Sequence, residues 1–339
     1  MLAVELRAFG GPDGLVLTEL PEPQPGRGEV RVDLVAAALN RRDWWIRRGR
    51  KVALPAVLGS DGAGVVSAVG PDVEGVSVGD EVVLYPGIGW GDDESAAADD
   101  FHLIGVPGPG THAEQIVVGA DQVRPRPPGW SWLEAAALPV AGLTAWRALV
   151  TCGDAGPGKT VLVTGAGGGV ATFAVQLGAA LGARMLVTTS STTKLERARS
   201  LGAADGVDYR HPGWPDRVRP VDVVLDSVGG DVWRCALACL RTGGVLVAFG
   251  DTGGETGSVP IAAFFFGYLR IQGTTLGSPR EFDALLAHCA EASWRPVIDS
   301  VYPLAEAAEA HERLDAPDRF GKVLLAIDAL RAAEDRANR

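Results

Sequence analysis

The chain has 339 residues, of which 47% are hydrophobic and 22% charged, and its formal net charge is −11. This composition is typical of a globular protein with one or two domains and excludes a largely disordered chain. An acidic surface repels phosphate groups, which argues against nucleic acid and anionic membranes as partners. No apolar run reaches the roughly 18 residues of a membrane span, and no signal peptide is recognisable, so we expect a cytoplasmic protein.

The four cysteines are scattered along the chain and include no C-x-x-C pair. A disulfide framework needs more cysteines in a shorter chain, so buried thiols are the simplest expectation.

Short extended segments separated by turn residues dominate the first part of the chain. Glu29–Ala38, Gly62–Val69 and Glu81–Leu84 are predicted strands, bounded by Gly, Pro and Asp. Gly87–Gly110 has no periodicity and carries five acidic residues, which predicts a mobile surface loop. A β-rich domain is therefore expected here.

The pattern changes after about residue 128. Ser131 is positioned to cap a helix over Leu133–Ala137, with Glu134 completing a capping box. Strands and helices then alternate, which predicts a parallel sheet buried on both faces. The predicted strands are Thr160–Thr164, Arg184–Thr189, Asp222–Asp226, Val245–Gly250 and Arg270–Leu276, and the clearest helices are Val170–Leu181 and Thr193–Leu201.

The end of the chain returns to the earlier style. Val297–Tyr302 and Lys322–Ile327 are predicted strands around a helix at Ala305–Leu314, and the last ten or so residues are expected to fray. We therefore predict an α/β protein in which a doubly wound Rossmann sheet (residues 129–294) is inserted into a β-rich domain (residues 1–128 plus 295–339).

A strand, a glycine turn and a helix follow one another from Val161 to Leu181. Small residues let the backbone approach a pyrophosphate, and the helix N-terminus offers it unpaired N–H groups. The G-x-G-x-x-G template is met only loosely, and a glycine turn without a ligand is the alternative. The predicted pyrophosphate-binding residues are Gly165, Ala166, Gly168, Gly169 and Val170.

The residues after the second strand indicate the cofactor. An NAD site usually has Asp or Glu there, to accept from the ribose 2′-OH. This chain has hydroxyls and an ammonium instead, including Thr189, Ser190 and Lys194, which can donate to a 2′-phosphate. NADP is the predicted cofactor, and a helix cap followed by a solvated lysine is the alternative.

Several motifs along nearly the whole chain match one known family. They are Ala38–Asp43 (ALNRRD), Leu58–Gly64 (LGSDGAG), Ala135–Thr144 (AAALPVAGLT), the glycine turn, Asp226–Gly230 (DSVGG) and Phe320–Val323 (FGKV). The chain thereby resembles the medium-chain dehydrogenase/reductase superfamily, in its quinone oxidoreductase and zinc-type alcohol dehydrogenase-like branches. The resemblance implies that the β-rich domain is a GroES-like catalytic domain.

The zinc enzymes of this superfamily hold a catalytic metal with Cys, His and Cys or Asp. At the matching positions this chain has Asn40, Ser60 and, near Pro139, no ligating side chain. The Gly87–Gly110 segment has no cysteines for a structural zinc, and His102 and His112 are expected to be surface groups. We therefore expect no metal site.

The resemblance also implies roles for individual residues. Asn40, Asp43 and Trp45 match the residues that line the nicotinamide pocket and form the predicted catalytic set, although relatives have Tyr at Trp45. Alternatively, Asn40 and Asp43 cap the following helix, and Trp44 and Trp45 belong to the core. The remaining predicted cofactor contacts are Thr144, Tyr209, Val228, Gly250, Gly277 and Lys322.

The expected function is reduction of a quinone or an α,β-unsaturated carbonyl by NADPH without zinc. One alternative is a zinc-free dehydrogenase or enoyl reductase acting on another carbonyl or CoA substrate, with the basic run Arg47–Lys51 attracting an anionic group. Another is a non-enzymatic NADPH-binding protein that binds RNA or has a structural role. The resemblance further implies a homodimer that pairs the outer Rossmann strand, near Phe264–Leu276.

Overall fold

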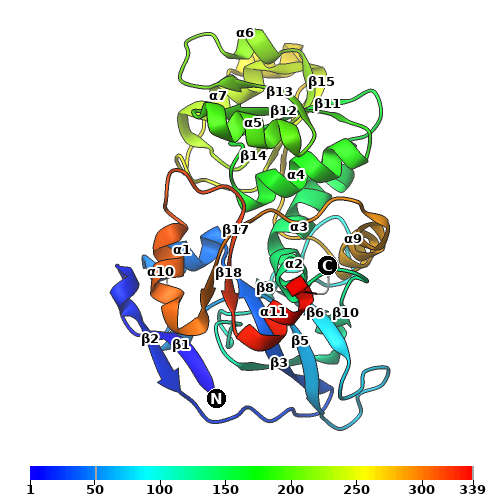
Figure 1. The fold of residues 1–339 in the computed structure, drawn as a ribbon. Helices are drawn as coiled ribbons and strands as arrows, with labels where there is room; N and C mark the ends of the chain where they lie inside the picture. The colour runs from blue at the N-terminus through cyan, green and yellow to red at the C-terminus, as the bar shows by residue number, and fades with distance from the viewer. Residues whose placement is uncertain (50–51, 338–339) are drawn as a thin grey trace. The chain divides into compact units, whose positions relative to one another are not determined.

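The computed structural model describes residues 1–49 and 52–337, so Arg50 and Lys51 of the basic run lie outside the described residues. The chain forms two compact units. Unit 1 comprises residues 1–140 and the chain from Ser278 onward, and unit 2 comprises residues 141–277 (Figure 1). No helix of the described chain has both the length and the hydropathy needed to cross a membrane.

The main sheet of unit 1 has the strand order β10-β6-β5-β3-β18-β17, and β9 also pairs with β3. All neighbours are antiparallel except β17 and β18. Strand β18, near the end of the chain, thus lies beside β3, which belongs to the first part of the chain (Figure 1). The strands of this sheet are β3 (Glu29–Ala38), β5 (Asp61–Val69), β6 (Glu81–Leu84), β9 (Gln115–Gly119), β10 (Val123–Pro125), β17 (Ile298–Pro303) and β18 (Lys322–Ala326).

Smaller elements complete unit 1. Its helices are α1 (Arg41–Arg47), α2 (Trp132–Ala137), α9 (Pro279–Glu291), α10 (Ala307–Arg313) and α11 (Ala329–Ala337), and α3 (Pro139–Trp146) begins at its boundary. The two small sheets contain β1 (Leu2–Leu6), β2 (Leu15–Glu19) and β4 (Ala56–Val57), and β7 (Gly87–Ile88) and β8 (His102–Leu103). The predicted capping box is confirmed, because Ser131 Oγ accepts from the Glu134 N–H and Glu134 accepts from the Ser131 N–H.

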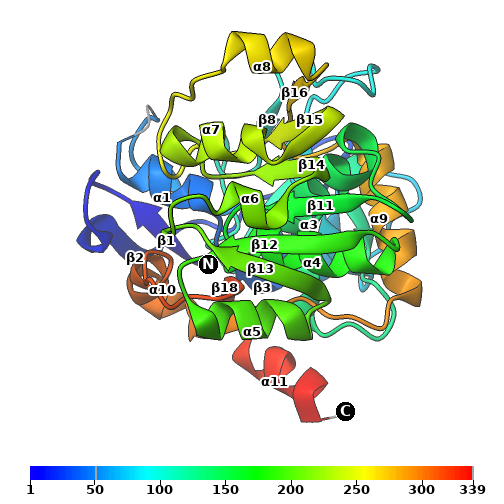
Figure 2. The same cartoon turned by 90° about the horizontal axis from the view of Figure 1, so that it is seen from above.

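Unit 2 is a six-stranded sheet with the order β13-β12-β11-β14-β15-β16 and only parallel neighbours (Figure 2). This is the doubly wound Rossmann order, so the predicted fold class is confirmed. The strands are β11 (Thr160–Val163), β12 (Arg184–Thr189), β13 (Ala203–Asp208), β14 (Val221–Asp226), β15 (Leu240–Ala248) and β16 (Arg270–Gly273). The helices are α4 (Gly169–Ala180), α5 (Thr192–Ser200), α6 (Pro215–Val218), α7 (Gly230–Ala238) and α8 (Ile261–Phe266).

Strand β13 has no counterpart among the predicted strands. Its sequence AADGVD has one β-branched residue, Val207, and no aromatic residue, and Ala, Gly and Asp are depleted in strands. It forms because its backbone pairs in parallel with β12, from Met185 to Thr189. Tertiary pairing here overrides a weak local preference.

Two segments that were expected to be mobile or frayed contain regular secondary structure. In Gly87–Gly110, β7 pairs with β8, and the buried Trp90 packs edge-on against Phe101 at 5.2 Å between ring centroids. Glu94 also accepts a hydrogen bond from Ser278 Oγ. The expected frayed end forms α11, whose Ala332 joins the unit 1 core. Gly87–Gly110 is held by ring packing within the segment and by the hydrogen bond to Ser278, and the C-terminal helix by its contact with the unit 1 core.

The boundaries of the compact units differ from the predicted domain boundaries. Residues 129–140 and 278–294, which we assigned to the inserted domain, belong to unit 1. Helix α2 packs on β5 and β3, and the Trp130 indole N–H donates to the Cys289 carbonyl at 3.3 Å. These contacts lie entirely within unit 1.

Candidate functional site

A buried polar network lies at one end of the main sheet of unit 1. Ala38, the last residue of β3, is opposite Asp61 on one side and Leu324 on the other. This pairing brings Lys322 to Asp61. The Lys322 Nζ donates to three acceptors, namely Leu39 O (2.9 Å), Asn40 Oδ1 (2.7 Å) and Asp61 Oδ2 (2.8 Å). Because an ammonium has three donors, Lys322 is fully saturated.

Asp61 is completely buried and accepts from two further donors. These are Asn40 Nδ2 at 2.9 Å and the Val140 N–H at 2.7 Å. Burial raises the pKa of the Asp61 carboxyl, and the neighbouring Lys322 charge opposes that rise. The network therefore joins three distant chain segments through one buried ion pair.

The helix-cap alternative holds for Asp43 but not for the side chain of Asn40. Asp43 Oδ2 accepts from the Asn40 N–H at 2.8 Å, and its Oδ1 accepts from the Gly59 N–H at 3.3 Å. The Asn40 amide instead bonds Lys322 and Asp61. Asp43 is fully buried, so it holds α1 and the Gly59 turn together.

Trp45, the third predicted catalytic residue, lies beside Trp44 on α1. The two rings meet edge to face with centroids 4.6 Å apart, and both are only partly buried. The Trp44 indole N–H donates to Asp315, and the Arg48 guanidinium lies 4.5 Å from its ring centroid. Neither tryptophan is a core residue of unit 1, contrary to that alternative.

The residues at the zinc-ligand positions of relatives do not fit a zinc ion. Asn40 Oδ1 lies 2.7 Å from the Lys322 Nζ, and Ser60 Oγ lies 2.7 Å from the Arg42 Nη1. A divalent cation there would face two positive charges, with an amide and a hydroxyl in place of thiolate or imidazole. Within the described residues, no group of three or more His, Cys, Asp or Glu side chains could hold a metal.

His112 is fully buried, so its expected surface position was wrong. Its ring lies 5.6 Å from that of the equally buried His311, and no ring nitrogen of either has a hydrogen-bond partner. Burial lowers the pKa of both imidazoles, most strongly that of His311, so both are neutral near pH 7.

In unit 2, a buried carboxylate organises the ends of the central strands. Asp226, at the end of β14, accepts from Thr164 Oγ1 at 2.6 Å and from the Gly229 N–H at 2.9 Å. Thr188 Oγ1 at the end of β12 accepts from the Gly165 N–H at 3.0 Å. Ligands of doubly wound sheets bind at these carboxyl ends of strands.

The glycine turn leaves its backbone open to a ligand. Gly165 has φ +80°, which favours glycine, and a Cβ there would meet only Val228 Cγ2, at 4.0 Å. A Cβ at Gly168 would meet only Ala171 Cβ, also at 4.0 Å. The turn leads into α4, whose first N–H groups have no partner within the helix. This arrangement fits a pyrophosphate.

Some of the hydroxyl side chains around the end of β12 bond to the local backbone, and others do not. Thr189 Oγ1 accepts from the Ser191 N–H at 3.1 Å, and Ser191 Oγ accepts from the Lys194 N–H at 3.3 Å as the cap of α5. The cap alternative therefore holds for Ser191. Ser190 makes no hydrogen bond to any described residue.

Sequence reasoning missed a charged pair at this edge. Asp208 is opposite Thr189 in the β12–β13 register. Arg210 donates to both Asp208 oxygens, and these hydrogen bonds lower the pKa of Asp208 to about 2. Tyr209 between them is 41% exposed. The only signal was the Asp-Tyr-Arg run, and nothing predicted the strand that positions it.

The remaining predicted cofactor residues are distributed as follows. Thr144 is buried on α3, and Gly250 follows β15, where a Cβ would lie 2.8 Å from Ser227 O. Gly277 is the last residue of unit 2, whereas Lys322 belongs to unit 1. The structure thus places Gly165, Thr189, Val228 and Gly250 at the carboxyl ends of the unit 2 strands, namely β11, β12, β14 and β15.

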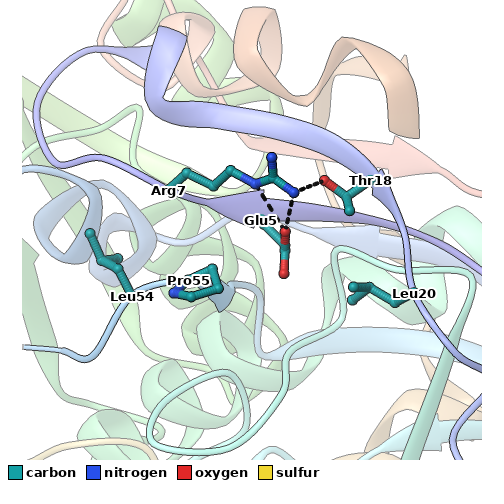
Figure 3. A pocket seen from close by; sticks show the side chains of 6 residues that line it. All are labelled: Glu5, Arg7, Thr18, Leu20, Leu54 and Pro55. Atoms are coloured by element: carbon teal, nitrogen blue, oxygen red, sulfur yellow. Dashed lines mark hydrogen bonds and ion pairs between the residues drawn. The ribbon is translucent and has the colours of Figure 1, made fainter.

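A surface pocket of unit 1 contains none of the predicted site residues (Figure 3). Arg7 donates there to Glu5 at 2.9 Å and to Thr18 at 3.0 Å. Its lining is completed by Leu20, Leu54 and Pro55. Because the polar groups satisfy one another, the pocket offers no unpaired charge to a ligand.

Comparison with known proteins identifies the family. Residues 26–128 match the alcohol dehydrogenase GroES-like domain, and residues 169–291 match the zinc-binding dehydrogenase family. A zinc-type alcohol dehydrogenase-like protein YogA of Leptosphaeria maculans is 35% identical, covering 92% of this chain and 94% of the relative. A quinone oxidoreductase of Pseudomonas aeruginosa is 34% identical, covering 95% and 98%.

A solved structure supports the same assignment. It is described as an NAD-dependent alcohol dehydrogenase and is 40% identical, with a TM-score of 0.91 over 96% of this chain and 100% of its own. Superfamily members of this kind use nicotinamide cofactors. The chain therefore belongs to the medium-chain dehydrogenase/reductase superfamily and is an oxidoreductase, as the resemblance predicted.

Proposed function

We propose that this oxidoreductase uses NADPH to transfer hydride to a quinone or an α,β-unsaturated carbonyl without zinc. The observation that carries the proposal is that the side-chain oxygens of Asn40 and Ser60 accept hydrogen bonds from the cationic side chains of Lys322 and Arg42. Alcohol oxidation in zinc enzymes needs a metal to polarise oxygen. A conjugated acceptor needs mainly a correctly placed hydride and a hydrogen bond to the developing oxyanion.

The predicted residues of unit 1 take different parts in this proposal. Trp45 is partly exposed and is the member of the set able to lie against a bound ring. Asn40 and Asp43 are positioning residues, because their side chains are engaged by protein groups and mostly or fully buried. They fix the start of α1 and hence the side chains that follow.

The preference for NADPH rests on the edge formed by β12 and β13. Ser190 and Lys194 follow β12, and the residues directly after that strand include no carboxylate. The carboxylate nearby, on Asp208, is held by Arg210 and is not available to a ribose hydroxyl. The relative described as NAD-dependent makes NADH the competing cofactor.

One set of measurements on the purified protein tests the proposal. Tryptophan fluorescence titrations with NADPH and NADH should show tighter binding of NADPH. Turnover should be seen with quinones or enones, and metal analysis should find no stoichiometric zinc. Binding of neither nucleotide, a stoichiometric zinc content, or no turnover of any conjugated acceptor would each contradict it.

The second candidate is a zinc-free dehydrogenase or enoyl reductase acting on another carbonyl or CoA substrate, and the Arg47–Lys51 run is the feature that tests it. Arg47 is 2% exposed and donates to the Gly10 carbonyl, so it does not belong to an exposed basic patch. Arg48 is exposed but lies over Trp44. The described part of the run therefore gives this candidate little support.

We also propose that the protein forms a homodimer through the edge of the unit 2 sheet. Strand β16 is one of the two edge strands of this sheet, and α8 precedes it. Phe266 and Tyr268 are 74% and 76% exposed, and Phe265 and Ile271 are also exposed. An apolar surface beside an open strand edge is typical of a protein interface.

A further inference from the structure

The guanidinium of Arg42 forms hydrogen bonds with the described protein groups through only one of its three nitrogens. The Arg42 Nη1 donates to Ser60 Oγ at 2.7 Å and to the Ile104 carbonyl at 3.0 Å. Ser60 Oγ itself donates to that carbonyl at 2.6 Å, which orients the hydroxyl lone pairs toward Arg42. A planar group fixed at one nitrogen by two acceptors has a defined orientation.

The other two nitrogens of the group are unused. Nε and Nη2 make no hydrogen bond to any described residue, and they are not among the buried polar atoms that lack a partner, so solvent reaches them. Arginine has five N–H donors and no acceptor. Three donors in one plane are thus available to a ligand.

No carboxylate of the described chain forms an ion pair with Arg42. Asp43 and Asp61 are the nearby acids, but Asp43 accepts from Asn40 and Gly59, and Asp61 accepts from Lys322, Asn40 and Val140. Burial lowers the pKa of the Arg42 guanidinium, although such a group stays charged at neutral pH. Asp43 and Asp61 stabilise the Arg42 charge from a distance, but no described carboxylate contacts its Nε and Nη2, so an oxygen ligand at these N–H groups would be favourable.

The place of this cation is informative. The resemblance implies that Ser60 corresponds to a metal-ligand position of the zinc enzymes, and in this chain the Ser60 hydroxyl holds Arg42. The resemblance thus implies that a positive group lies next to the position of the electrophilic metal in those enzymes. Sequence analysis did not single out Arg42.

We propose that Arg42 binds the oxygen of the acceptor through Nε and Nη2 and stabilises the oxyanion formed on hydride transfer. This inference rests on the proposed function. The hydride forms a C–H bond with the conjugated acceptor, whose π electrons move to the oxygen, while NADPH is oxidised to NADP⁺. Arg42 keeps its proton, and the enolate or hydroquinone anion is protonated from water.

The matched pair for the test is Arg42→Gln and Arg41→Gln, adjacent residues on the same helix. Arg41 instead pairs with Asp315 at 2.9 Å, outside the proposed machinery. Removal of one oxyanion donor costs about 100-fold or more in kcat, so we expect that loss for Arg42→Gln with an unchanged Kd for NADPH. Arg41→Gln should stay within about twofold of the wild type.

Two further arms separate a chemical from a structural role. Ethylguanidinium should restore part of the rate of Arg42→Ala, which a purely structural defect would not allow. Calorimetric binding of p-nitrophenolate, an oxyanion probe, should weaken in Arg42→Gln and not in Arg41→Gln. This binding arm needs no turnover.

The outcomes distinguish the two proposals. If the wild type turns over acceptors but Arg42→Gln is folded and equally fast, the role of Arg42 is refuted while the reaction class stands. If the wild type reduces no acceptor but phenolate binding depends on Arg42, the reaction class fails and the oxyanion site remains. Phenolate affinity that is the same in both variants and the wild type overturns the site itself.

Discussion

Lys322 Nζ and Asp61 Oδ2 form an ion pair of 2.8 Å whose side chains are 3% and 0% exposed. The pair joins the beginning of β18 to the beginning of β5, on the two sides of β3. Asn40 bonds both partners. The chain thus uses its first and last parts to complete one polar cluster in the interior of unit 1.

Lys322→Met should destabilise the protein by about 3–5 kcal/mol, because it leaves the Asp61 carboxylate buried without its cation. Urea denaturation followed by circular dichroism measures this change. Arg27→Gln is the control, because its ion pair with Asp72 is exposed and should contribute less than about 1 kcal/mol. Equal small losses in both variants would show that the buried pair is replaceable.

Acidification should destabilise the fold through His112 and His311. Their folded-state pKa values lie below the ordinary value of 6.5. The unfolded chain therefore binds their protons first, so the free energy of unfolding falls as pH drops below about 6.5, by up to about 1.4 kcal/mol per pH unit for each imidazole. Asp43, near His112, works against this effect, whereas Arg47, near His311, reinforces it.

His311→Leu isolates this contribution. The difference in unfolding free energy between about pH 7 and pH 5, from urea titrations, should be smaller in the variant than in the wild type. An unchanged pH dependence would mean that these histidines do not titrate on unfolding.

Ser60→Ala should lower kcat by about tenfold, because Arg42 loses one of its two anchoring hydrogen bonds. The loss should be smaller than that of Arg42→Gln, and the KM for NADPH should not change. Steady-state kinetics with a quinone provide the measurement. A larger loss than that of Arg42→Gln would assign the chemistry to Ser60 itself.

Lys194→Gln should weaken NADPH binding by about tenfold, since it removes a charged donor proposed to face the 2′-phosphate. NADH binding should stay nearly the same because NADH lacks that phosphate. Arg199→Gln on the same helix is the control, because Arg199 pairs with Asp205. Fluorescence titrations with both nucleotides decide the matter, and equal weakening of both would contradict the assignment.

Phe266→Glu should shift the protein from dimer to monomer, because it places a charge in the proposed apolar interface at β16 and α8. Sedimentation at micromolar protein concentration would detect the shift. Val78→Glu is the control, since Val78 is a 63% exposed apolar residue of unit 1. A wild type that is already monomeric would refute the dimer.

Local sequence patterns were sufficient for much of the fold. The strands Glu29–Ala38, Glu81–Leu84 and Arg184–Thr189 have the predicted bounds, as does the capping box of Ser131 and Glu134. These features depend on neighbours a few residues away, through the alternation of apolar side chains and the capping of helix N–H groups. The glycine turn before α4 belongs to the same class.

The tertiary structure alone decided which polar groups are buried together. Nothing local to Asn40 indicates that its amide bonds Lys322 and Asp61 instead of capping α1, or that Arg42 bonds Ser60. The same holds for β13, which exists because β12 offers it a backbone ladder. A hydrogen bond or ion pair depends on distances that are set only when the sheet brings remote segments together, and local periodicity carries no information about those distances.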